Sequence, residues 1–388
     1  MKIFRTLSTA RLIVLAAVVV VVAAGGAFAV AATGGSGPTP APKPLAQAIH
    51  DALAGQTPAG ITANIGFTNT LFPSGALTGQ VGSALMSSAT GRLWVNANGG
   101  RLELQSDAGD AQIVWSKTKV TVYDATSNTA YTADIPQDTT ATKPDTGSAI
   151  PTVDEITTFL TGLSKDWTVS SADPSNTGGQ ESYTVKVSPS HDGGLLGSAQ
   201  VAFDALRGVP LKVAIYAQGS SSPVLALEAT NVSYGDVPNS DVQVAPPAGA
   251  KIVDLSSQAQ GGSSSGSSTP PVTGLAAVTA AAPFTVVAPD TLVGLPRQDV
   301  RHVGGKTVIA VYGQGLGAVA VVERAKDATA AKASPLNALP QVTIDGATGH
   351  ELATQLGTVL TWDRTGVSYV LAGSLPSAAA EAAARSLK

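Results

Sequence analysis

Apolar and polar residues alternate with a period of two along most of the chain between residues 61 and 255. In residues 101–105, for example, Leu102 and Leu104 alternate with polar neighbours. Turn signals such as Asn-Gly-Gly at 98–100 and Asp-Ala-Gly-Asp at 107–110 separate these runs at short intervals. The pattern predicts a meander of antiparallel hairpins with one apolar face.

The most regular alternation lies in residues 201–216. Val201–Asp204 and Leu211–Tyr216 flank the turn Gly208-Val209-Pro210. This predicts a hairpin with one face in the core and the other in water.

Two segments have helical rather than strand periodicity. Leu45, Ile49 and Leu53 mark one face of a short helix that begins after a proline. Residues 151–163 place apolar side chains at helical spacing behind a capping box of Thr152 and Glu155. We expect the second helix to cover the apolar face of the sheet.

The C-terminal part repeats the strand pattern on a smaller scale. Strands are predicted near 308–312, 318–322 and 367–371. A terminal helix with Leu375, Ala379, Ala383 and Leu387 along one stripe follows. This region is therefore predicted to be a small α+β domain.

Composition divides the chain into segments. Residues 33–44 are rich in Gly and Pro and predict an extended stalk, and 256–274 are mostly Ser and Gly and predict a flexible linker of roughly 25 Å. The predicted organisation is a cytoplasmic n-region at 1–11, an apolar segment at 12–32, the stalk at 33–44, a first domain at 45–255, the linker at 256–274 and a second domain at 275–388.

The apolar segment Leu12–Ala32 contains no charge and follows Lys2, Arg5 and Arg11. At 1.5 Å per residue it extends about 30 Å, enough to cross a bilayer with the N-terminus in the cytoplasm. Ala27-Phe28-Ala29 also fits a signal-peptide cleavage site. The two interpretations are a single-pass membrane anchor and a cleaved signal that leaves a secreted protein, and both place the rest of the chain outside the cytoplasm.

Composition excludes several classes of function. The chain has no cysteine, so it has no disulfide, no thiolate metal site and no acylated lipoprotein cysteine. Charged residues make up 13% and the net charge is -4. Such a chain has no basic field for a phosphate backbone, so no nucleic acid is expected as a partner.

Short catalytic motifs occur in unsuitable places. Gly262-Ser263-Ser264-Ser265-Gly266 matches a nucleophile elbow but lies in the predicted linker, and Ser116-Lys117-Thr118-Lys119 matches S-x-x-K but lies at a predicted hairpin turn. Gly305-Lys306-Thr307 lacks the preceding glycine of a phosphate-binding loop, and the four histidines lack helical metal-pair spacing. We predict no enzymatic activity, no catalytic residues, no metal and no cofactor.

The order of several strand fragments resembles one known family. These fragments are 91–95, 101–104, 112–114, 122–124, 130–131, the 201–216 hairpin, Val232–Pro238 and Ala245–Ala250. Together they resemble the LolA-like lipoprotein-carrier fold, which the sigma-factor regulatory proteins of the MucB/RseB type share. The strands of the C-terminal part look like the smaller MucB/RseB domain. The bias toward Ala, Val, Gly and Thr suggests a high-GC actinobacterial source.

The resemblance implies an α+β fold, with a curved antiparallel half-barrel and a helical lid around an apolar cavity, plus a small α+β C-terminal domain. It implies an extracytoplasmic cell-envelope protein that binds acyl chains, a lipid or a lipidated protein (a lipoprotein). The alternative is a regulatory or sensor module that binds a membrane protein such as an anti-sigma factor. Candidate cavity residues are Ile65, Phe67, Leu102, Leu104, Ile113, Phe159, Leu163, Phe203, Val213 and Ile215. Apolar residues at period two are also what an ordinary packed core contains, and the sequence does not choose between the two.

Overall fold

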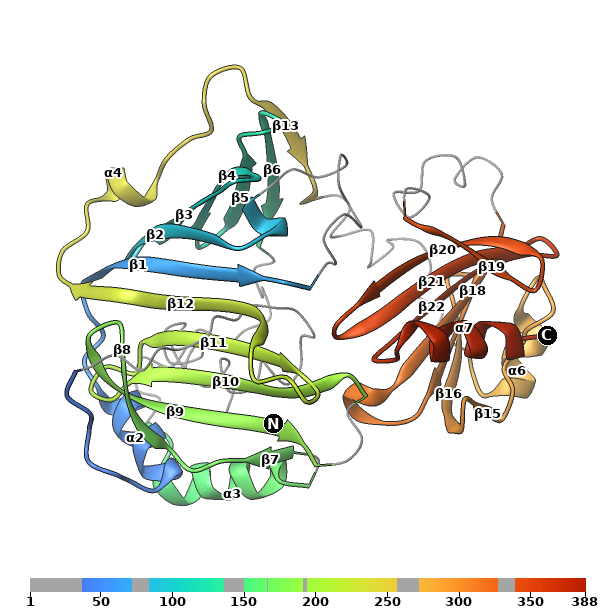
Figure 1. The fold of residues 1–388 in the computed structure, drawn as a ribbon, viewed down its shortest axis with the longest axis horizontal. Helices are drawn as coiled ribbons and strands as arrows, with labels where there is room; N and C mark the ends of the chain where they lie inside the picture. The colour runs from blue at the N-terminus through green and yellow to red at the C-terminus, as the bar shows by residue number, and fades with distance from the viewer. Residues whose placement is uncertain are drawn as a thin grey trace. The chain divides into compact units, whose positions relative to one another are not determined.

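The computed structural model describes residues 37–71, 84–135, 150–165, 167–190, 194–256, 272–326 and 339–388. These residues form two compact units, shown in Figure 1. The first unit holds the described residues up to 256, apart from residues 71 and 194–197, which cluster with the second unit, 272–388.

The first unit begins with a helix and continues mainly as strands. Its N-terminal half contains α2 (Leu45–Ala54), β1 (Gly60–Asn69), the 3-10 turn η2 (Ala84–Met86), β2 (Ala89–Asn96), β3 (Gly99–Ser106), β4 (Gly109–Ser116), β5 (Lys119–Asp124) and β6 (Thr129–Asp134). Its C-terminal half contains α3 (Val153–Leu163), β7 (Trp167–Val169), β8 (Asp173–Thr177), β9 (Gln180–Pro189), β10 (Leu196–Asp204), β11 (Pro210–Ala217), β12 (Pro223–Tyr234), α4 (Asn239–Val242) and β13 (Lys251–Asp254).

Within the described residues these strands form one 13-stranded sheet. Its order is β13-β6-β5-β4-β3-β2-β1-β12-β11-β10-β9-β7, and β8 pairs with β9. The pairing is antiparallel except between β13 and β6. The sheet is strongly curved but not closed into a barrel, as Figure 1 shows. The predicted meander and the predicted fold class are therefore confirmed.

Helices α2 and α3 cover one end of this sheet, beside β9 and β10 (Figure 1). Ile49 and Leu53 of α2 and Ile156 of α3 pack in one core with Tyr183 of β9 and Phe203 of β10. The predicted capping box of α3 is present, because Glu155 N–H donates to the Thr152 hydroxyl and Thr152 N–H donates to the Glu155 carboxylate. Both predicted helices are confirmed.

The 201–216 hairpin differs from the prediction, because both of its faces are buried. Ala202, Lys212, Ala214 and Tyr216 occupy the face that was expected in water, and each is at most 8% exposed. The charge of Lys212 is accommodated by Glu228, which lies directly opposite on β12 with Nζ and Oε2 3.4 Å apart. Alternation alone assigns a charged residue to the solvent face. It does not reveal that Lys212 has its counter-charge, Glu228, on the neighbouring strand β12.

Part of the predicted stalk is held along the first unit. Tyr183 donates its hydroxyl to the Ala41 carbonyl, Asn176 donates to the Pro38 carbonyl, and Lys43 forms a bridge with Ala172. The described residues from 38 to 43 therefore follow the sheet and do not project from it.

The second unit contains a nine-stranded sheet within the described residues. Its elements are β14 (Val272–Thr273), α6 (Leu275–Ala281), β15 (Thr291–Leu292), β16 (Leu295–Val303), β17 (Thr307–Tyr312), η3 (Gly315–Gly317), β18 (Val319–Ala325), β19 (Gln341–Ile344), β20 (Ala347–Thr354), β21 (Gly357–Arg364), β22 (Val367–Gly373) and α7 (Ser377–Ser386). The two-residue Asp345-Gly346 turn joins β19 to β20 with positive φ at both residues, as a tight hairpin requires.

The predicted terminal helix is present as α7, which packs on the sheet of the second unit with a stripe that is shifted from the predicted one. Its buried residues are Ala380, Ala383 and Ala384, and Leu387 is buried just after the helix, whereas Ala379 is only partly buried. Small alanines let the helix approach strands β21 and β22 closely. The small α+β domain predicted for this region is confirmed.

The predicted apolar segment 12–32, the Ser263–Ser265 motif and most of the predicted linker lie outside the described residues. Among the helices that the structure describes, none is long and apolar enough to span a bilayer.

Candidate functional site

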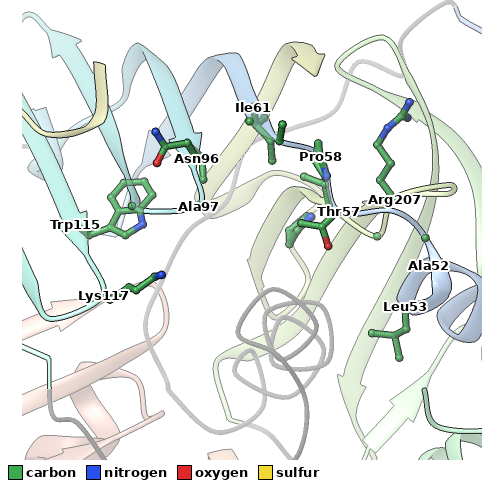
Figure 2. Close-up of a pocket in the computed structure, with 18 of the residues that line it drawn as sticks. Ala52, Leu53, Thr57, Pro58, Ile61, Asn96, Ala97, Trp115, Lys117 and Arg207 are labelled. Atoms are coloured by element: carbon green, nitrogen blue, oxygen red, sulfur yellow. The ribbon is translucent and has the colours of Figure 1, made fainter. Parts of the chain in front are cut away.

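A pocket of about 430 Å³ lies in the first unit, where several strands of the curved sheet begin or end (Figure 2). Its walls come from the end of α2, the loop into β1, the β2–β3 turn, the end of β4 and the β10–β11 turn. It is lined by Ala52, Leu53, Gly55, Thr57, Pro58, Ala59, Gly60, Ile61, Val95, Asn96, Ala97, Gly99, Trp115, Ser116, Lys117, Arg207, Gly208, Val209 and Pro210. The volume falls in the usual range for small-molecule sites, and the lining is mainly apolar.

The sheet wall of the pocket is one row of paired residues. Ile61 on β1 pairs with Val95 on β2, Val95 with Gly100 on β3, and Gly100 with Trp115 on β4. A Cβ on Gly100 would come within 2.2 Å of the Trp115 ring. The missing side chain therefore lets the indole lie across the neighbouring strand and present its ring to the pocket.

The opposite wall is the β10–β11 turn, which Asp204 organises. Asp204 is 1% exposed, and its carboxylate accepts hydrogen bonds from the backbone N–H groups of Leu206 and Arg207, at 2.8 and 2.7 Å. It also accepts the Tyr234 hydroxyl at 2.6 Å. Burial and this hydrogen bond raise the pKa of Tyr234, so its hydroxyl stays protonated. The turn is thus held in one conformation by groups away from the pocket.

Two glycines bring helix α2 against this turn. A Cβ on Gly55 would meet the Leu206 carbonyl oxygen at 2.1 Å, and one on Gly208 would meet the Ala52 carbonyl oxygen at 2.6 Å. Gly208 also has a φ of +65°, which side chains disfavour. The end of α2 and the turn therefore form a continuous wall through close backbone contact.

Among the lining residues that the structure describes, the charged ones are Lys117 and Arg207. Lys117 lies in the β4–β5 turn and Arg207 in the β10–β11 turn, on opposite sides of the pocket (Figure 2). The Arg207 guanidinium lies over the Tyr234 ring, 4.4 Å from its centroid, and 3.5 Å from the Asp204 carboxylate. Arg207 is therefore held in place by Tyr234 and Asp204.

Five of the predicted cavity residues lie together on the face that carries the pocket. Ile65, Phe67, Leu102 and Leu104 are buried in one apolar core, and Ile113 packs against it. Leu102 pairs with Ile113, one row of side chains away from the Gly100–Trp115 row. The predicted face therefore adjoins the pocket, although none of these five residues lines it.

The other predicted residues lie further along the sheet. Val213 pairs with Leu227 on β12, which pairs with Phe67, so Val213 shares the same row. Ile215 is buried two residues further along β11. Phe203 packs in the separate core beneath α2 and α3, and Phe159 and Leu163 of α3 are partly buried. The ten residues are therefore not gathered around one cavity in the described part of the chain, and their role as lining stays a prediction.

The pocket residues that the sequence analysis missed come from strand ends and turns. Ile61, Val95 and Trp115 have the parity of the predicted apolar face, which was an available signal. Thr57–Gly60 and Gly208–Pro210 carry no periodic pattern. Only the curvature of the sheet brings these turns together.

Ser116 of the S-x-x-K motif lies at the turn between β4 and β5, where the sequence predicts a hairpin turn. The Ser116 hydroxyl accepts the backbone N–H groups of Thr118 and Lys119, as expected for a turn residue. Among the residues that the structure describes, no group of three His, Asp or Glu side chains is placed to hold a metal ion.

Comparison with known proteins finds structural matches only. No protein-family model matches the chain, and no curated protein sequence matches it. The chain is similar to MucB in the Pseudomonas aeruginosa MucA/MucB complex, with 14% identity, coverage of 88% of this chain and 94% of that one, and a TM-score of 0.42. A second structure, MucB in complex with MucA(peri), has 13% identity, the same coverage and a TM-score of 0.41.

A third match is a domain described as a putative outer membrane lipoprotein-sorting protein from Vibrio parahaemolyticus. Its identity is 10%, it covers 50% of this chain and 95% of its own, and the TM-score is 0.21. MucB proteins and a lipoprotein-sorting domain, the groups that the sequence resembles, are thus among the solved structures that match.

Proposed function

We propose that this protein binds an acyl chain, outside the cytoplasm and without catalysing a reaction, in the apolar pocket between the curved sheet, the end of α2 and the β10–β11 turn. The observation that carries the proposal is the pocket itself, with the Trp115 ring, Ile61 and Val95 on one wall and Val209 on the other. The free energy of binding would come from burial of methylene groups, at about 0.8 kcal/mol each.

The dimensions of the pocket fit part of an acyl chain. A methylene group needs about the space of one water molecule, roughly 30 Å³. The volume of about 430 Å³ then accepts on the order of a dozen methylene groups. Occupants that fit are a lipid, a free acyl chain, or the acyl chain of a lipoprotein.

The proposal is tested by native mass spectrometry of the full chain, solubilised in amphipol and incubated with lipid. We expect bound acyl lipid on the parent protein and its loss in Ala97→Trp, since Ala97 is an exposed turn residue that lines the pocket. The matched control is Ala125→Trp, at an exposed alanine of the β5–β6 turn outside the pocket. A parent protein that never carries or accepts lipid would contradict the proposal.

The second candidate function is binding of a membrane protein such as an anti-sigma factor. It rests on the sequence resemblance, and the MucB structures named above are complexes with MucA. Ala97→Trp separates the two functions. A membrane-protein partner, first identified by crosslinking to the parent protein in cells, should still crosslink to this variant if its binding does not use the pocket, whereas bound lipid should be lost.

A further inference from the structure

The N-terminal segment of the described chain is fixed to the first unit at a defined place. The Pro38 carbonyl accepts a hydrogen bond from buried Asn176 of β8 at 2.9 Å, and a Cβ on Gly37 would come within 2.4 Å of the same side chain. Buried Tyr183 of β9 donates to the Ala41 carbonyl at 2.6 Å. Asn176 is the second-last residue of β8, so the chain before Gly37 leaves the unit beside the β8–β9 turn.

The β8–β9 turn lies at the pocket end of the first unit, where β10 and β12 end and β1 and β11 begin. The Gly178 carbonyl in this turn accepts the N–H of Val232, near the end of β12, at 2.9 Å. The Glu181 carbonyl accepts the N–H of Ala205, the first residue of the β10–β11 turn, at 2.9 Å. The β10–β11 turn is one wall of the pocket. The N-terminal segment and the pocket are therefore at the same end of the unit.

An exposed apolar side chain lies at this end as well. Leu206 is in the middle of the β10–β11 turn and is 65% exposed, more than any other large apolar residue in the described part of the chain. Its backbone N–H is held by the Asp204 carboxylate at 2.8 Å. A single exposed leucine is ordinary on a protein surface. This one, however, lies at the end from which the chain continues toward the predicted membrane anchor.

The predicted anchor ends only a few residues before the fixed segment. The apolar segment 12–32 ends at Ala32, and Gly37 is the fifth residue after it. Each residue extends a chain by at most about 3.6 Å, so Gly37 can lie no further than about 18 Å from Ala32. The sequence predicts a stalk over residues 33–44, but residues 37–43 are fixed to the sheet. That stalk is therefore too short to hold the first unit far from a bilayer.

We infer that the pocket end of the first unit lies against the membrane that holds the apolar segment 12–32, with Leu206 in the head-group region of the bilayer. The partner is the lipid surface itself, which an exposed apolar side chain enters favourably. The inference rests on residues 12–32 staying in place as an anchor and not on what the pocket binds. Together with the proposed function, it places the pocket beside the bilayer that supplies the acyl chain.

The test compares how close the two ends of the sheet lie to the bilayer. The chain has no cysteine, so a single-cysteine variant carries one donor dye. Ala54→Cys places the dye at the exposed end of α2, beside the β10–β11 turn. The matched control, Ala125→Cys, is an exposed alanine beside Asp110, roughly 20 Å along β4 from the pocket end of that strand.

Both full-length proteins are reconstituted in phosphatidylcholine vesicles in which a fraction of the head groups carries an acceptor dye. We expect energy transfer from residue 54 to be several-fold more efficient than transfer from residue 125. The reason is that the first position lies at the membrane surface and the second lies a strand length away from it.

Two further changes in the Ala54→Cys protein separate the tether from the leucine. Inserting about 20 Gly and Ser residues between Ser36 and Gly37 adds roughly 25 Å of flexible chain and should lower the transfer. Leu206→Asp should lower it too, because an apolar contact with the bilayer is lost. The matched control is Ile252→Asp on β13, at a side chain that is 57% exposed, and it should leave the transfer unchanged.

Equal transfer from residues 54 and 125 would overturn the inference, and so would cleavage after Ala29 in cells, since no anchor would then remain. Transfer that survives Leu206→Asp would overturn the placement of Leu206, and transfer that survives the insertion would overturn the role of the short tether. None of these results depends on bound lipid in native mass spectrometry. The inference and the proposed function can therefore fail separately.

Discussion

Lys212 and Glu228 form a buried ion pair in the centre of the first sheet. Their side chains are 3% and 11% exposed. Burial lowers the pKa of Lys212 and raises that of Glu228, while the attraction between the two opposes both shifts. Each charge is thus tolerated only because the other lies opposite it.

Replacing one member of this pair should therefore cost more than replacing both. We expect Glu228→Gln to lower the free energy of unfolding by about 3 kcal/mol, because Lys212 is left buried without a counter-charge. The double variant Lys212→Met with Glu228→Leu should stay close to the parent. Urea denaturation measures both, and equal losses in the single and double variants would contradict this account of the pair.

Glu323 makes the second unit sensitive to pH. It is fully buried, and both carboxylate oxygens accept the Val287 N–H, at 3.2 and 3.0 Å. Burial raises its pKa to about 7 from an ordinary value of 4.5, against the opposing effects of Val287 and Arg364. The folded state therefore binds this proton more tightly than the unfolded state does.

Protonation of Glu323 contributes roughly 3 kcal/mol to the free energy of unfolding of the second unit. This contribution is fully present below pH 4.5 and is lost as the pH rises through 7. Glu323→Gln keeps an acceptor for Val287 but does not titrate. We expect the variant to lose this pH dependence and to be more stable than the parent at pH 8. Urea denaturation at pH 5 and pH 8, followed by the fluorescence of Trp362 in the same unit, measures the difference. Parallel pH profiles for the two proteins would rule out this role.

The elements were largely predictable where hydrophobic periodicity is strong. Residues 45–54 and 153–163 show helical spacing, and 60–134 alternate, so their elements followed from the sequence. The expected wet face of β11 was wrong, because alternation does not reveal that Lys212 meets a partner on β12. Strand parity identifies a face, but only register identifies neighbours.

Strand β3 illustrates how register builds the pocket wall. Gly100 pairs with Trp115, whose ring occupies the space that a side chain at position 100 would need. We expect Gly100→Ala to lower the free energy of unfolding by about 1–3 kcal/mol by overpacking and to shift the emission of Trp115.

The control for this substitution is Gly162→Ala in α3. A Cβ on Gly162 would meet no atom within 4 Å, and alanine favours a helix by about 1 kcal/mol over glycine. This variant should be as stable as the parent or more so. A Gly100→Ala protein with unchanged stability and emission would contradict the packing of Trp115 over Gly100.

For the first unit as a whole, the curved sheet and its apolar face were predictable, whereas the position of the pocket was not. The ten predicted lining residues are central strand and helix positions, because periodicity selects those. The pocket instead lies where the loop after α2, two hairpin turns and the end of β4 converge. That convergence depends on sheet curvature, which no local pattern encodes.

The central claim is that an acyl chain lies beside Trp115 on the face of the first sheet that carries the pocket. Trp94 provides an internal comparison, because it occupies the other face of the same sheet, where it pairs with Arg101 and contacts its guanidinium. Two full-length variants, each retaining one of these tryptophans with the others replaced by Phe, are titrated with dibromostearic acid, whose bromines quench only at short range. We predict saturable quenching of Trp115 and little quenching of Trp94. Equal quenching of both, or none of Trp115, would contradict the account.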